Sequence, residues 1–151
     1  MLSSKFFGAC AIWLVGLGVY FIFLRPALLP EDPRFMGTSI ESLRTAAPGL
    51  ERWLGHVFDV LGGFMVATGT LTLLVACRTL ARRTRGTLIA MAVAGAAGVA
   101  LMSATNFILQ SDFRWVLLAP ALLWLAGLWR YLTEGLRPCP HGRAERSNHR
   151  L

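Results

Sequence analysis

Four long apolar runs, separated by short charged segments, restrict what this chain can fold into. The first run, residues 6–24, contains no charged residue. A bilayer core about 30 Å thick is crossed by about 20 residues of helix, and helices satisfy their own backbone hydrogen bonds in lipid. The other runs cover about residues 53–77, 87–109 and 115–132. We therefore predict an all-α integral membrane protein, a four-helix up-down bundle with a long outer loop between spans 1 and 2. This transmembrane domain would occupy residues 1–132.

Composition agrees with a membrane protein. Hydrophobic residues make up 55% of the chain and charged residues only 15%, whereas soluble domains carry about 25% charged residues. A cleaved signal peptide would have an apolar region of about 7–15 residues followed by a small-x-small cleavage site. The first run is longer than this and ends in Leu24-Arg25-Pro26, so we expect it to be a retained span.

The distribution of basic residues predicts the orientation. The N-terminus, the 78–86 loop and the region from residue 130 onward hold ten of the 15 basic residues: Lys5, Arg78, Arg82, Arg83, Arg85, Arg130, Arg137, Arg143, Arg146 and Arg150. The other side holds Arg25, Arg34, Arg44, Arg52 and Arg114. Because cytoplasmic loops carry the excess of Lys and Arg, we predict that both the N- and C-termini are cytoplasmic. The strong preference for arginine over lysine, typical of a GC-rich genome, favours a bacterial source.

The C-terminal segment, residues 133–151, is basic, polar and interrupted by proline. We expect a disordered cytoplasmic tail that rests near anionic lipid headgroups, since basic residues near a membrane surface are attracted to them. The net charge of +7 does not indicate a nucleic-acid partner, because no stacking aromatic residues accompany the arginines.

Small residues in the second and third spans predict close helix packing. Helices in lipid gain no hydrophobic driving force from meeting, so small side chains that allow close backbone approach are favoured at their contacts. We expect Gly63, Ala96, Gly98 and Ala100 to lie at such contacts, the third span to be central, and Gly98→Leu to disrupt folding. These small residues could equally form the contact with a membrane-protein partner or between the copies of a homo-oligomer.

The outer loop is the least generic segment. Pro26, Pro30 and Pro33 predict an extended or turning path around the charged Glu31, Asp32 and Arg34. Thr38 followed by Glu41 fits a capping box, which predicts a short interfacial helix after it. We expect the loop to fold over the outer mouth of the bundle.

Strongly polar side chains gather in the outer half of the spans. His56 and Asp59 are three residues apart and share a helix face, with Asp59 about 9 Å beyond Trp53 by helical rise. Asn106 is placed at a comparable depth in the third span. Two interpretations remain open. Asp59 could pair with His56, Arg25 or Arg52 while Asn106 bonds across helices, or these five residues could line an outward-facing pocket that binds a small polar solute or relays protons.

No residue pattern indicates catalysis, a cofactor or a metal. The three cysteines form no CxxC pair, and His56 with Asp59 supplies only two ligands where a metal needs three or four. The enzyme class thus has no support in the sequence.

The segment RPALLPEDPRFMG followed by GGFMVATGTLTLLVA resembles a family of uncharacterised small four-span bacterial inner-membrane proteins, a domain of unknown function. The resemblance covers roughly residues 20–110 and implies a bacterial inner membrane but no activity. We expect a small non-enzymatic accessory or assembly factor; the alternative is an outward-facing binder or transporter of a small polar solute around Asp59.

Overall fold

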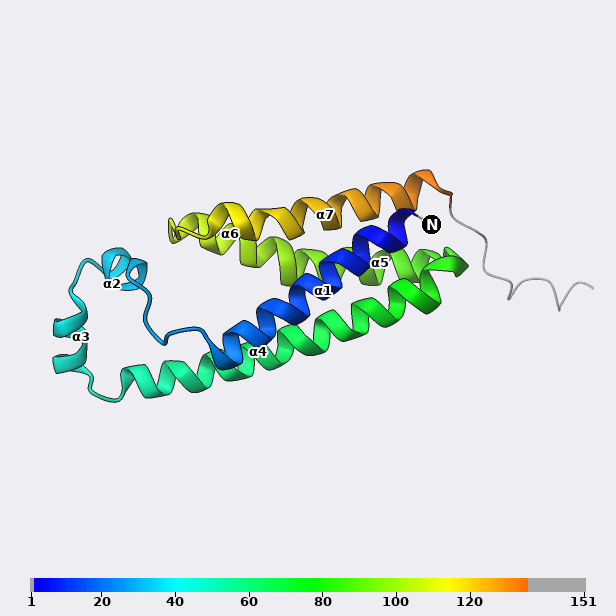
Figure 1. The fold of residues 1–151 in the computed structure, drawn as a ribbon. Coiled ribbons are helices and arrows are strands. Elements are labelled where there is room, and N and C mark those ends of the chain that lie inside the picture. The colour runs from blue at the N-terminus through cyan, green and yellow to red at the C-terminus, as the bar shows by residue number, and fades with distance from the viewer. Residues whose placement is uncertain (1, 136–151) are drawn as a thin grey trace, which may run out of the picture.

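The computed structural model describes residues 2–135 of the 151-residue chain. These residues form helices and connecting turns, with no strand among them (Figure 1). The α-helices are α1 (Leu2–Phe23), α2 (Glu31–Met36), α3 (Ile40–Ala46), α4 (Leu50–Leu74), α5 (Arg85–Ala94), α6 (Leu101–Ile108) and α7 (Arg114–Thr133). A π-helical turn, Val75–Thr79, and a 3-10 turn, Leu80–Arg82, continue α4, and a second π-helical turn, Gly95–Ala100, joins α5 to α6.

Four helical segments are long and apolar enough to cross a membrane: Leu2–Phe23, Leu50–Arg82, Arg85–Ile108 and Arg114–Thr133. The prediction of an all-helical chain with four candidate spans is therefore confirmed. In the most apolar stretch of each segment only 22–28% of the residues are buried within the chain. Most of the apolar surface therefore faces outward, as expected where lipid is the solvent.

Helices α1 and α7 are the inner helices, because α1 packs against α4 and α7, and α7 packs also against the third span (Figure 1). The contact of α1 with α4 depends on glycine. A Cβ at Gly18 would lie 2.6 Å from the carbonyl oxygen of Gly62, and a Cβ at Gly62 would lie 2.7 Å from that of Gly18. Farther along, a Cβ at Gly69 would lie 2.8 Å from the carbonyl oxygen of Ala11. The two backbones meet where side chains are absent, which is how membrane helices associate closely.

The second contact of α1 is aromatic. The rings of Phe7 and Trp124 meet edge to face with centroids 5.3 Å apart, and Phe7 also covers Gly127, where a Cβ would lie 3.0 Å from its ring. Cys10 donates through Sγ to the carbonyl oxygen of Pro120, 3.3 Å away. Such aromatic pairs contribute about 0.5–1.5 kcal/mol beyond burial.

The third span, Arg85–Ile108, packs on α7 around Trp124. Its π-helical turn begins at Gly95, where any Cβ would overlap the indole of Trp124. The indole Nε1 donates to the carbonyl oxygen of Met91 at 2.9 Å. Nearer the end of α7, the Tyr131 hydroxyl donates to the carbonyl oxygen of Thr84 at 3.1 Å. One face of the span is therefore fixed by two aromatic side chains of α7.

The prediction of which small residues lie at helix contacts is wrong for contacts within the chain. Gly63 and Gly98 have open space where a side chain would extend, and Ala96 and Ala100 are exposed. The glycines that do pack are Gly18, Gly62, Gly69, Gly95 and Gly127. Small residues occur on nearly every side of the third span, so composition could not identify the buried face, and the span is not central.

The two glycines of the π-helical turn should respond differently to a large side chain. We expect Gly95→Leu to lower stability by about 2–3 kcal/mol, because it overpacks the site against Trp124. Gly98→Leu should change stability little, because nothing lies within 4 Å of its Cβ position. Thermal unfolding of both variants in detergent tests this ranking, and equal losses would contradict it.

The connection between α1 and α4 contains two short helices. Helix α3 is the short helix predicted after Thr38, whereas α2 corrects the extended or turning path predicted around Glu31, Asp32 and Arg34. Pro33 lies in the first turn of α2, where a helix does not need the amide hydrogen that proline lacks. The capping box was misplaced by one residue. Ser39, not Thr38, caps α3, and its Oγ accepts the Ser42 amide at 3.1 Å.

The predicted tail, residues 133–151, lies almost entirely outside the described residues, and α7 includes Thr133. The expectation of disorder and the basic residues Arg137, Arg143, Arg146 and Arg150 fall in the part that is not described.

Candidate functional site

Two residues of the predicted polar pocket lie together on the exposed surface of α4. His56 Nδ1 is 3.7 Å from Asp59 Oδ2, one turn apart on α4. Their side chains are 78% and 52% exposed. Even a fully charged pair with this exposure would contribute only about 0–1 kcal/mol, so the contact neither fixes the fold strongly nor encloses a ligand.

The other three pocket residues are placed differently. The guanidinium of Arg25 lies 3.5 Å above the ring centroid of Phe58 and 5.1 Å from that of Phe21. Burial lowers the pKa of Arg25, an effect that the negative charges of Asp32 and Glu31 oppose. Arg52 is exposed on the first turns of α4. Asn106 Nδ2 donates to the carbonyl oxygen of Met102, 2.9 Å away in its own helix, rather than to another helix.

The pairing of α1 with α4 also changes the depth expected for Asp59. Arg25 follows the end of α1 and stacks on Phe58, the neighbour of Asp59. A charged guanidinium favours the membrane–water boundary, which brings Asp59 toward the same level. The 33-residue helix Leu50–Arg82 is about 50 Å long, longer than a 30 Å core requires. Its first turns extend past the end of α1 (Figure 1).

The outer connection is attached to the turn between α6 and α7 by polar contacts. Ser111 Oγ donates to Glu31 Oε1 at 2.9 Å, and both residues are buried. Arg34 and Asp112 form an exposed ion pair with Nη2 and Oδ1 3.6 Å apart. Asp32 Oδ2 accepts the Leu29 amide at 2.8 Å. Glu31, Asp32 and Arg34, the charged loop residues singled out from the sequence, therefore hold α2 in place. Their partner Ser111 was not predicted.

A second polar cluster lies at the end of the molecule opposite the outer connection, where it joins three helical segments. The sequence did not indicate this cluster. The Arg83 guanidinium donates to Glu134 Oε2 and, at 3.3 Å, to the carbonyl oxygen of Gly135. The Ser3 hydroxyl donates to the same carboxylate at 3.0 Å. Arg83 and Ser3 are buried. Ser3 lies in the first turn of α1 and Glu134 directly follows α7, so the first helix begins and the last helix ends at the same end of the molecule.

This cluster acts on the ionisation of Glu134. Partial burial of the carboxyl raises its pKa, but hydrogen bonds from Arg83 and Ser3 outweigh this effect, and the pKa lies below its usual value. Glu134 is therefore held as a carboxylate. Arg83 has a positive φ of 51°, and its side chain points inward. The sequence of residues 78–85, RTLARRTR, has no spacing that distinguishes Arg83 from the other arginines.

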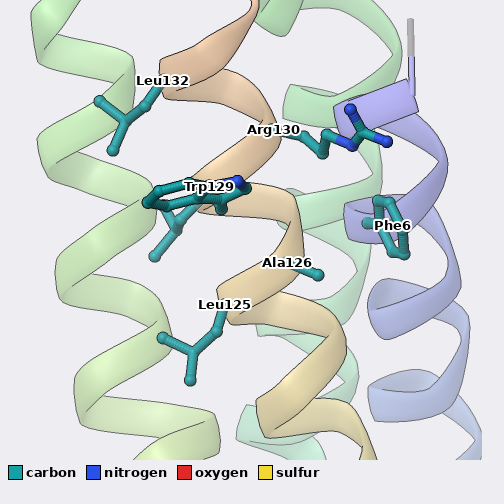
Figure 2. Close-up of a pocket in the computed structure, with 7 residues that line it drawn as sticks. Phe6, Leu125, Ala126, Trp129, Arg130 and Leu132 are labelled. Carbon is teal, nitrogen blue, oxygen red and sulfur yellow. The ribbon is translucent and has the colours of Figure 1, made fainter.

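An open groove runs along α7 at the same end (Figure 2). It has a volume of about 510 Å³ and is almost wholly apolar. Leu125 and Trp129 lie on one side and Phe6 and Arg130 on the other, with Ala126 between them (Figure 2). We call this surface the α7 groove.

Metal ligands do not gather anywhere in residues 2–135, since no group of three His, Cys, Asp or Glu side chains could hold an ion there. Comparison with protein-family models, curated proteins and solved structures found no match to this chain.

Proposed function

We propose that this protein is a small non-enzymatic accessory or assembly factor of a bacterial inner membrane. In this proposal the four spans form an up-down bundle with the outer connection on the far side and both termini in the cytoplasm. The third span offers its outward face to a partner membrane protein or to a second copy of the chain.

The observation that carries this proposal is the outward position of the small residues in the third span. Between residues 96 and 104, five of them are exposed: Ala96, Ala97, Gly98, Ala100 and Ala104. In lipid, a surface of small residues lets another helix approach closely, while the face toward α7 is already occupied by Trp124. The π-helical turn at Gly95–Ala100 adds support, because such turns recur at functional sites.

The orientation is supported by the described charges. Lys5, Arg78, Arg82, Arg83, Arg85 and Arg130 lie at the end that holds Ser3 and Glu134. Basic residues in the short segment before Arg85 count most for topology, because the positive-inside effect is strongest in short loops.

Binding or transport of a polar solute around Asp59 has less support. Asp59 is half exposed, and Asn106 is engaged within its own helix. Among the five residues proposed for that pocket, the described contacts join only His56 and Asp59.

A photo-crosslinking amino acid at Ala97 tests the proposed face. We expect one discrete adduct in native membranes, larger than the chain itself, because a partner helix would lie against this position. Ala100→Leu should reduce the yield several-fold by keeping that helix away. Gel electrophoresis followed by mass spectrometry identifies the adduct as a second copy or another protein.

The matched control places the same crosslinker at Leu71, which is 62% exposed on α4. We expect only diffuse lipid adducts there. Equal protein adducts from both positions, or a yield at Ala97 that ignores Ala100→Leu, would count against the proposal.

A further inference from the structure

The α7 groove combines an apolar channel with a positive charge at one end. In Figure 2 the Arg130 side chain reaches from α7 toward the first turn of α1, above the ring of Phe6. Below it, toward Leu125, the lining is apolar. Ala126 leaves space between the larger side chains on either side (Figure 2). A long apolar chain with an anionic head would match this order of groups.

The Arg130 guanidinium has no acidic partner within the described part of the chain. Glu134, the acidic group one turn farther along, is bonded to Arg83 and Ser3. Arg130 is exposed and forms no ion pair with an acid in residues 2–135. Lys5 is also exposed and precedes Phe6, which adds a second positive charge at the start of α1.

The groove lies where a lipid headgroup would be found. Trp129 is 69% exposed beside Arg130, and tryptophan prefers the membrane–water boundary. Helix α7 ends four residues later, at Thr133. The volume of about 510 Å³ falls within the range of about 300–1,000 Å³ typical of small-ligand sites.

We infer that the α7 groove binds one anionic phospholipid of the adjacent leaflet. Its phosphate pairs with the Arg130 guanidinium, and one acyl chain lies over Ala126 between Phe6 and Leu125. Arginine suits this role because its guanidinium can donate two hydrogen bonds to a phosphate. The groove lies on α7 and α1, apart from the face of the third span proposed for a partner.

Native mass spectrometry of the full chain in detergent tests this inference with equimolar phosphatidylglycerol and phosphatidylcholine. We expect the wild type to retain phosphatidylglycerol preferentially. Arg130→Gln should lower its occupancy roughly fivefold, equivalent to about 1 kcal/mol, and Arg130→Lys should retain most of it. Ala126→Phe should also reduce occupancy, because the ring fills the groove.

Arg78→Gln is the control, because Arg78 is an exposed arginine at the same end on the turn after α4. We expect it to bind lipid as the wild type does. The inference fails if Arg78→Gln and Arg130→Gln lose equal occupancy. It fails also if Ala126→Phe binds normally, since charge alone would then explain retention. Circular dichroism verifies folding, and Ala126→Phe tests the groove without altering any charge.

Discussion

Gly62→Leu is expected to destabilise the protein by about 3 kcal/mol or more, among the largest losses for substitutions at glycine. The added side chain would start 2.7 Å from the backbone oxygen of Gly18 and from Ile22 Cγ1. Backbone atoms cannot rotate away as a flexible side chain can, so α1 and α4 would have to separate. Thermal or denaturant unfolding in detergent micelles measures the loss.

The neighbouring glycine supplies the control for this prediction. Gly63 has no atom within 4 Å of its Cβ position, and Gly63→Leu makes the same chemical change one residue along the same helix. We expect it to leave stability almost unchanged. Gly18→Leu, on the other side of the contact, should reproduce the effect of Gly62→Leu. Comparable losses from Gly62→Leu and Gly63→Leu would show that α1 and α4 do not meet at this register.

Glu134→Gln is expected to cost about 2–3 kcal/mol of stability, since it removes a charge-assisted bond and leaves Arg83 buried without its counter-charge. The Arg83 side chain is 9% exposed and that of Glu134 22%. Glu51→Gln is the matched control. Its ion pair with Arg44 is 2.9 Å long but exposed, and exposed pairs contribute about 0–1 kcal/mol.

The same pair predicts a dependence on pH. Because the folded-state pKa of Glu134 is lowered, its stabilisation is fully present above the ordinary glutamate pKa of about 4.3. It is lost as the pH falls through the lower folded-state value. Melting temperatures measured from pH 7 to pH 3 should therefore fall more steeply for the wild type than for Glu134→Gln. Parallel curves for the two proteins would contradict the assignment.

Hydropathy predicted the four helical segments, because a long uncharged run has one stable backbone form in lipid. It could not predict which small residues face inward. Gly62 and Gly63 are equivalent to any measure of composition, yet only Gly62 contacts α1. Helix α2 of the outer connection was also missed, since proline was counted as a helix breaker although Pro33 occupies a first turn that tolerates it.

The polar residues show the same difference between contacts of residues close in the sequence, which could be predicted, and contacts of residues far apart, which could not. His56 and Asp59 were expected to share a face because their spacing is local, and they are 3.7 Å apart. The pairing of Ser111 with Glu31 spans 80 residues, and that of Arg83 with Glu134 spans 51. Spacing rules do not reach across such separations, so these contacts required the fold. The pocket around Asp59 stays a prediction.

The bonds from Ser3 and Arg83 to Glu134 also constrain the order in which the chain can assemble. The glycine contact between α1 and α4 uses residues up to Gly69 and can form while the rest is still being synthesised. Arg83 and Ser3 have no carboxylate to meet until Glu134 has left the ribosome. A chain that stops before that residue would present an unpaired arginine at the membrane surface, a feature by which quality control could distinguish unfinished from finished molecules.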